Sequence, residues 1–170
     1  MHPLTKDDRP PASDSTGPMA RALREAEAAA ARGEVPVGAV IVERATEVVV
    51  AAAGNRIVEL KDPTAHAELI AIREACRVKG SERLIGCDLH VTLEPCAMCA
   101  QAIAFARIDR LYFGASDPKG GGVEHGARIF AQPTCHHRPE VYGGINEQAA
   151  ANLLRSFFAA RRPDLTGEGV

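Results

Sequence analysis

Short β-branched segments alternate with longer helical segments along most of this 170-residue chain, and this alternation limits the folds open to it. Apolar spacing and helix start and stop signals predict helices over residues 18–32, 65–79, 95–107 and 146–162. Runs rich in β-branched or apolar residues predict strands over residues 35–42, 47–53, 89–93, 111–113 and 139–142, with the first two forming a hairpin. Helices interspersed with strands pack on both faces of a sheet. We therefore predict an α/β fold, a three-layer α/β/α arrangement around a mixed central sheet of about five strands.

Composition and loops divide the chain into one domain with two tails. The chain is 46% apolar and 25% charged, which is typical of a soluble domain with a buried core. We expect a disordered tail at residues 1–17, a domain at residues 18–162 and a flexible tail at residues 163–170. Residues 54–61 are predicted to be a loop. Residues 114–138 form a longer loop, with at most one helical turn near 125–131, and ordered loops of this length are usually functional.

Charge and cysteine content exclude several classes of protein. A net charge of −2 gives no general attraction to nucleic acid, so such binding would have to be local. The chain shows no apolar stretch typical of a secretory signal or a membrane span, which predicts a cytoplasmic protein without membrane association. The five cysteines are an odd number and only two lie close together, which disfavours a disulfide framework.

The two close cysteines, Cys96 and Cys99, form a Cys-x-x-Cys pair, which can bind zinc or act as a redox couple. A structural zinc site needs four protein ligands, which commonly come from two such pairs. The sequence contains no second Cys-x-x-Cys pair. With His66 the pair gives three ligands and leaves a fourth position for water, as in catalytic zinc sites. A redox couple would not need His66 and Glu68. We therefore expect one zinc ion per chain.

All four of these residues are expected in the first turns of two helices. Residues two apart on a helix do not face each other, so His66 and Glu68 can share one metal-bound water only near the helix end. The positive ends of two helices would also favour the thiolates of Cys96 and Cys99. The spacing thus predicts a site prepared for deprotonated ligands.

His66-Ala67-Glu68 followed by Pro95-Cys96-Ala97-Met98-Cys99 resembles the signature of the cytidine deaminase superfamily of zinc nucleobase deaminases. Four further segments, residues 34–40, 54–56, 62–68 and 92–96, are similar to bacterial tRNA-specific adenosine deaminases. This resemblance covers residues 18–162 and implies a cytidine deaminase-like fold. It also implies that the protein forms a homodimer. The implied RNA partner is the anticodon loop of a tRNA, specifically an arginine tRNA. In the resemblance His66, Cys96 and Cys99 bind zinc, Glu68 carries protons and Asn55 contacts the target nucleoside.

The implied reaction is hydrolytic deamination of adenosine to inosine at the wobble position of tRNA anticodons. A deaminase of a free base or nucleoside, of the guanine or cytosine type, is the alternative, because the same zinc and Glu68 would serve it equally well. A catalytically silent zinc-binding module is a third reading, but it would leave Glu68 without a task. Asn55 also has a simpler interpretation, as a turn residue.

The C-terminal helix supplies candidate substrate-binding residues, since RNA loops are bound by aromatic side chains beside basic groups. The candidates are Phe157, Phe158, Arg161 and Arg162. Adjacent helical positions point about 100° apart, so at least one phenylalanine is expected in the core. Three histidines, His125, His136 and His137, either face solvent or contact RNA. The small side chains of residues 97–106 permit the close helix packing that a homodimer would use.

Overall fold

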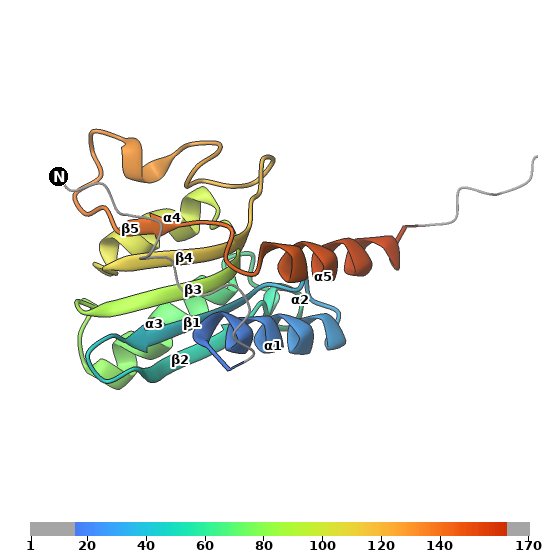
Figure 1. Ribbon diagram of the computed structural model, residues 1–170, viewed down its shortest axis with the longest axis horizontal. Helices are drawn as coiled ribbons and strands as arrows, with labels where there is room; N and C mark the ends of the chain where they lie inside the picture. Colours follow the sequence, from blue (N-terminus) through green and yellow to red (C-terminus); the bar gives the residue numbers. More distant parts are fainter. Residues whose placement is uncertain (1–15, 163–170) are drawn as a thin grey trace, which may run out of the picture.

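A computed structural model of the chain describes residues 16–162 and shows a five-stranded sheet covered by helices on both faces (Figure 1). The strand order is β2-β1-β3-β4-β5. β1 is antiparallel to β2 and to β3, whereas β3, β4 and β5 run parallel. The predicted α/β/α architecture with a mixed sheet is therefore confirmed. In chain order the elements are α1 (Pro18–Ala31), β1 (Gly38–Glu43), β2 (Val48–Gly54), α2 (Ile57–Leu60), α3 (Ala67–Lys79), β3 (Cys87–Leu93), α4 (Ala97–Phe105), β4 (Arg110–Ala115), η2 (Ile129–Ala131), β5 (Glu140–Tyr142) and α5 (Glu147–Ala159).

The helix layers are built largely from small side chains. α1 and α5 cover one face of the sheet, and α3 and α4 cover the other (Figure 1). α1 turns Ala22, Ala26 and Ala29 toward the interior, at the spacing of one helical face. The central strands contribute larger apolar residues such as Leu89 and Phe113, both fully buried. Small helix residues let the helices approach the sheet closely, so the core is filled with few aromatic rings.

The connections around the site gather at one end of the sheet. Gly38, which begins β1, pairs with Gly54, which ends β2. On the other side, Leu93 at the end of β3 pairs with Ala115 at the end of β4. The segments after β2, β3 and β4 therefore leave from the same edge, where ligands bind in many open α/β sheets. None of the helices in residues 16–162 is long and apolar enough to cross a membrane.

Two sequence predictions about local structure were wrong. Residues 54–61 are not only a loop, because they contain α2, whose start is held by the distant Glu34. The Glu34 carboxylate accepts hydrogen bonds from the backbone N–H groups of Val58 at 3.2 Å and Glu59 at 2.9 Å. The helix at 65–79 begins only at Ala67. Helix patterns miss such cases because they register only local spacing.

Other predicted boundaries shift by a few residues. β1 starts at Gly38, and the preceding residues 35–37 are irregular. The segment 114–138 begins with the last two residues of β4 and contains one short 3-10 helix, η2, within the range where a helical turn was predicted. The predicted tails at residues 1–17 and 163–170 fall outside the described residues, except for Thr16 and Gly17.

Candidate active site

Three side chains from two helix starts converge as metal-ligand donors. His66 is the N-cap residue of α3 and Cys96 is the N-cap residue of α4, so both precede the first turns in which they were predicted. Cys99 lies in the first turn of α4. His66 Nδ1 is 3.7 Å from Cys96 Sγ and 3.6 Å from Cys99 Sγ, and all three donor atoms lie within 4.8 Å of one another.

These separations fit a zinc ion. Zn–N bonds of about 2.0–2.1 Å and Zn–S bonds of about 2.3 Å at tetrahedral angles place nitrogen and sulfur about 3.6 Å apart. One imidazole and two thiols are also common zinc ligands, and a three-ligand set leaves one position open. No other such donor group occurs within residues 16–162. The donor set thus has the composition and spacing of a catalytic zinc site.

Hydrogen bonding within this group changes the acidity of its members. The hydrogen bond with Cys99 lowers the pKa of Cys96 to about 4, while the same contact and burial raise the pKa of Cys99. The hydrogen bond with Cys96 raises the pKa of His66. Both cysteines also lie at the positive end of α4, which stabilises a thiolate. Cys96 is therefore the member of this group that is held as a thiolate before any metal binds.

Glu68 lies beside these donors and is only 3% exposed. Burial raises the pKa of Glu68 to about 7. Among the described residues no hydrogen-bond partner reaches its Oε2 atom. A buried carboxylate oxygen without a partner is costly unless a ligand or water completes its hydrogen bonding. Its pKa near neutrality suits a group that accepts and then releases a proton.

Asn55 ties the elements of the site together. Its Oδ1 accepts a hydrogen bond from the backbone N–H of Ala67 at 2.8 Å, and its Nδ2 donates to the carbonyl of Val35 at 3.1 Å. It therefore fixes the start of α3, next to His66. The residue is 5% exposed and also contributes to the wall of the cavity described next.

A cavity of about 290 Å³ lies in front of the predicted metal site. The sequence had pointed to four of its lining residues. The remainder come from the segment before β1, the start of α2, the end of β3 and the loop after β4, which only the folded chain brings together. The spacing of residues in the sequence does not mark these other lining residues, although Glu94 lies just two positions before Cys96. The lining residues are Val35, Val37, Asn55, Ile57, His66, Glu68, Leu93, Glu94, Cys96, Asp117 and Gly120.

The candidate RNA-binding residues do not line this cavity. The helix predicted over 146–162 ends at Ala159, so Phe157 and Phe158 lie on α5 and Arg161 and Arg162 follow its end. Phe157 is buried and Phe158 is 49% exposed, so the expectation that one ring is in the core is confirmed. The Arg161 guanidinium lies 3.5 Å from the centroid of the Phe157 ring, where it makes a cation–π contact. On the outer surface of the helix a separate hollow is lined by Leu154, Arg155, Phe158, Ala159 and Arg162.

Two of the three loop histidines are engaged within the fold. His125 Nδ1 is 2.8 Å from Glu94 Oε2, and His137 Nε2 is 2.6 Å from the carbonyl oxygen of Ile108. The imidazoles of these two residues therefore help to hold the loop.

A three-ligand zinc site with a buried carboxylate beside a small cavity defines a zinc-dependent hydrolytic deaminase. Residues 13–115 match the model of the cytidine and deoxycytidylate deaminase zinc-binding region. The tRNA-specific adenosine deaminase of Agrobacterium fabrum is 59% identical over 146 residues, which are 86% of this chain and 95% of that protein.

Solved structures agree with this similarity. One of them comes from a study of A-to-I editing by tRNA:A34 deaminases. It is 59% identical in sequence with a TM-score of 0.78, and the match covers 81% of this chain and 98% of that chain. Guanine deaminase from Bacillus subtilis is 29% identical with a TM-score of 0.57, over 90% of this chain and 97% of that one. The chain belongs to the zinc-dependent cytidine and deoxycytidylate deaminase family, within its branch of tRNA-specific adenosine deaminases.

Proposed function

We propose that this protein converts adenosine to inosine, with release of ammonia, at the wobble position of tRNA anticodons. The observation that carries the chemistry is the unpartnered, buried carboxylate oxygen of Glu68 beside the three donors His66, Cys96 and Cys99. The choice of substrate is supported by relatives that are named for tRNA adenosine and are much more similar than the guanine deaminase.

The residues of the site divide the reaction between them. His66, Cys96 and Cys99 would hold zinc, and zinc would supply the nucleophile by lowering the pKa of a bound water to about 7. Glu68 accepts one proton from the attacking water and passes it to the purine ring nitrogen next to C6. It then takes the second proton from the oxygen newly bonded to C6 and delivers it to the departing amino group. Water adds at C6 and ammonia leaves, so adenosine and water become inosine and ammonia.

Asn55 orients the substrate in this proposal. The hydrogen bonds of its side chain to the backbone of Val35 and Ala67 also keep the start of α3 in place. The cavity is small, so the target base enters it alone, turned out of the anticodon loop as in other enzymes that modify bases. The exposed residues Phe158, on α5, and Arg162, just after it, contact neighbouring nucleotides, whereas Arg161 supports Phe157. The predicted arginine tRNA remains the proposed substrate.

A second copy of the chain and a cytoplasmic location complete the proposal. Phe105 is 70% exposed and lies beside a groove between α3 and α4 with Leu69, Ile72 and Ala102. A large apolar side chain beside such a groove suits a self-complementary contact, so we propose a homodimer through this face. A cytoplasmic location, where a tRNA substrate would be met, is part of the same proposal.

The decisive experiment compares substrates and the Glu68→Gln variant. The parent should release ammonia and form inosine from an anticodon stem-loop RNA that carries adenosine at the wobble position, and leave adenosine, guanine and cytosine unchanged. Glu68→Gln should lose activity by at least about 100-fold, because an amide cannot exchange the proton. It should keep one zinc per chain by metal analysis.

The exposed Glu27→Gln change on α1 is the matched control and should leave turnover unchanged. Turnover of free guanine or cytosine instead of RNA would support the alternative deaminase. A zinc-loaded protein that acts on none of these substrates would support the silent zinc-binding module.

A further inference from the structure

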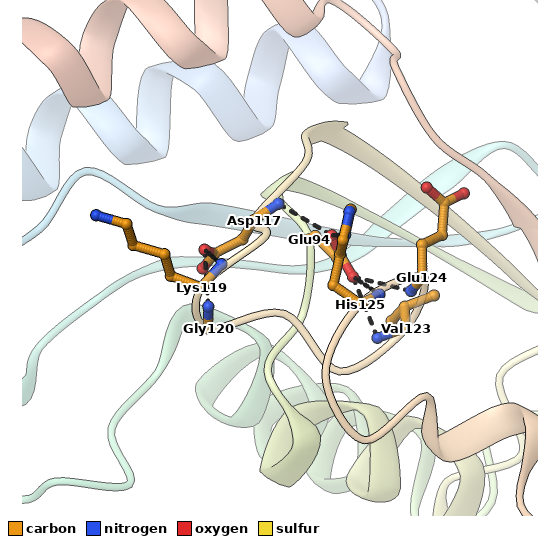
Figure 2. Close-up of polar contacts among 7 residues, drawn as sticks. All are labelled: Glu94, Asp117, Lys119, Gly120, Val123, Glu124 and His125. Carbon is orange, nitrogen blue, oxygen red and sulfur yellow. Dashed lines mark hydrogen bonds and ion pairs between the residues drawn. The ribbon is translucent and has the colours of Figure 1, made fainter.

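A second buried carboxylate, that of Glu94, lies between β3 and α4 and is only 2% exposed. Its Oε1 accepts hydrogen bonds from the backbone N–H groups of Val123, Glu124 and His125 at 3.3, 2.8 and 3.0 Å. Its Oε2 accepts the N–H of Asp117 at 2.9 Å and lies 2.8 Å from His125 Nδ1. Figure 2 shows the loop curving around this one side chain.

These bonds join both ends of one loop segment to a single point. Residues 117–125 contain no helix or strand, so their backbone groups need partners outside regular structure. Charged acceptors make stronger hydrogen bonds than neutral ones, and a buried carboxylate without donors would be costly. Glu94 and the loop therefore depend on each other.

The anchored segment forms one wall of the active-site cavity. Asp117 and Gly120 line it, and the Asp117 carboxylate closes their turn by accepting the N–H groups of Lys119 at 3.2 Å and Gly120 at 2.9 Å. In Figure 2 the Lys119 side chain extends away from Glu94. A displacement of the Asp117 backbone would therefore move that wall.

The same segment is pressed against the start of α4. Gly122 donates its N–H to the Pro95 carbonyl at 2.8 Å, and a Cβ atom at Gly122 would lie 2.4 Å from the Ala97 nitrogen. A Cβ atom at Gly121 would lie 2.5 Å from Glu94 Oε1. Real Cβ atoms do not approach so closely, so both positions require glycine.

We propose that Glu94 is a positioning residue whose carboxylate holds residues 117–125 against the start of α4, so that Asp117 and Gly120 form the substrate-binding wall of the cavity. The residue touches neither the reacting atoms nor the metal donors in this role. The part of the proposal that concerns substrate rests on the proposed function. The part that concerns the loop stands without it.

Glu94→Gln tests the anchor with almost no change in size. The amide oxygen can replace Oε1, but the amide NH₂ group then faces the N–H of Asp117, which loses its acceptor. We expect hydrogen exchange at the Asp117 amide to accelerate by about tenfold or more, since a buried donor without a partner is costly. KM for the anticodon stem-loop should rise about tenfold while kcat stays within about twofold, as for lost substrate binding. Zinc should remain at one ion per chain.

Two further variants make the outcome decisive. Gly121→Ala leaves the Glu94 carboxylate chemically unchanged but places a Cβ atom 2.5 Å from Glu94 Oε1 and 2.5 Å from the Asp117 carbonyl oxygen. It should therefore displace the anchored segment and reproduce the faster exchange and the higher KM. Asp88→Asn changes another buried carboxyl group, one that lines a cavity bordered by Arg44 and His90, and should alter neither. Equal exchange at Asp117 in Glu94→Gln and Asp88→Asn would overturn the anchor.

Substrate binding, measured as KM, is determined independently of hydrogen exchange. Faster exchange with an unchanged KM would retain the anchor but overturn the claim that this wall binds substrate. If the parent itself does not act on the stem-loop, the proposed function fails, while the exchange data still decide the role of Glu94.

Discussion

His90 shows how the sheet can control the charge of a single residue. Its imidazole stacks on Tyr112 with ring centroids 4.5 Å apart, and Tyr112 stacks in turn on Tyr142 at 4.9 Å. No hydrogen-bond partner within residues 16–162 reaches its Nδ1. Burial lowers the pKa of His90 to about 4, so the folded protein holds this residue neutral at physiological pH.

This residue should make the folded state sensitive to mild acid. The unfolded chain binds a proton at His90 near pH 6.5, whereas the folded chain does so only near pH 4. Between these values the unfolded state binds more protons, so the free energy of unfolding should fall as the pH is lowered, by up to about 3 kcal/mol from this group. Urea denaturation at several pH values from 7 to 4 measures the slope.

His90→Phe preserves an aromatic ring beside Tyr112 and removes the titration. The charged side chains that face the same cavity, Arg44, Glu47 and Asp88, are present in both proteins, so the difference between the two slopes belongs to His90. Parallel stability curves for parent and variant would contradict the assignment.

The site residues differ in how visible they are in the sequence. His66, Glu68, Cys96 and Cys99 could be identified because metal chemistry restricts both residue type and number. Glu94 and Asp117 line the same cavity, but a lone acidic residue has no distinctive spacing. Their roles depend on hydrogen bonds that span 23 to 31 positions, which only the fold brings together.

At the scale of elements, α5 combines a buried and an exposed aromatic residue on adjacent positions. Phe157 and Phe158 meet edge to face at 5.4 Å, and only Phe158 borders the outer hollow with Arg155 and Arg162. Arg161 instead covers Phe157, so its removal would disturb packing as well as charge. Phe158 and Arg162 are therefore the better pair with which to test RNA contact.

The double variant Phe158→Ala, Arg162→Ala should weaken binding to the anticodon stem-loop by about tenfold or more, because base stacking on an aromatic ring and a phosphate contact are both lost. The slope of log affinity against log salt should also fall by about 1. Fluorescence anisotropy across a salt series measures both. Arg24→Ala on α1 removes the same charge elsewhere and should have little effect. Parent-like binding by the double variant would make α5 purely structural.

Element boundaries show where local patterns stop being informative. The Ala-rich spacing of α1 and the Gly80 end of α3 are visible in sequence, because helix propensity and a left-handed C-cap are local properties. The short helix α2 is not, since its start depends on the Glu34 carboxylate from another part of the chain.

On the scale of the whole molecule, the face of α3 and α4 should decide the assembly state. Light scattering at micromolar concentration should report about twice the chain mass of 18.0 kDa for the parent. Phe105→Glu places a charge in the proposed contact and should shift the protein to the monomer. Val48→Glu, at another exposed apolar position 57% exposed, should remain dimeric. A parent that is monomeric at these concentrations would rule out the dimer.

The overall architecture was predictable because it follows from the order of helical and β-branched segments. Right-handed connections and the pairing of neighbouring strands leave few ways to arrange such an order in one sheet. Strand pairing in register, as between Val91 and Phe113, was not predictable, since it depends on packing across both helix layers.

The chain order of the site also bears on how the protein matures. A ribosome makes His66, Cys96 and Cys99 before it makes β4, and makes the loop that surrounds Glu94 only afterwards. The nascent polypeptide therefore presents a full set of zinc donors before the wall of its substrate cavity exists.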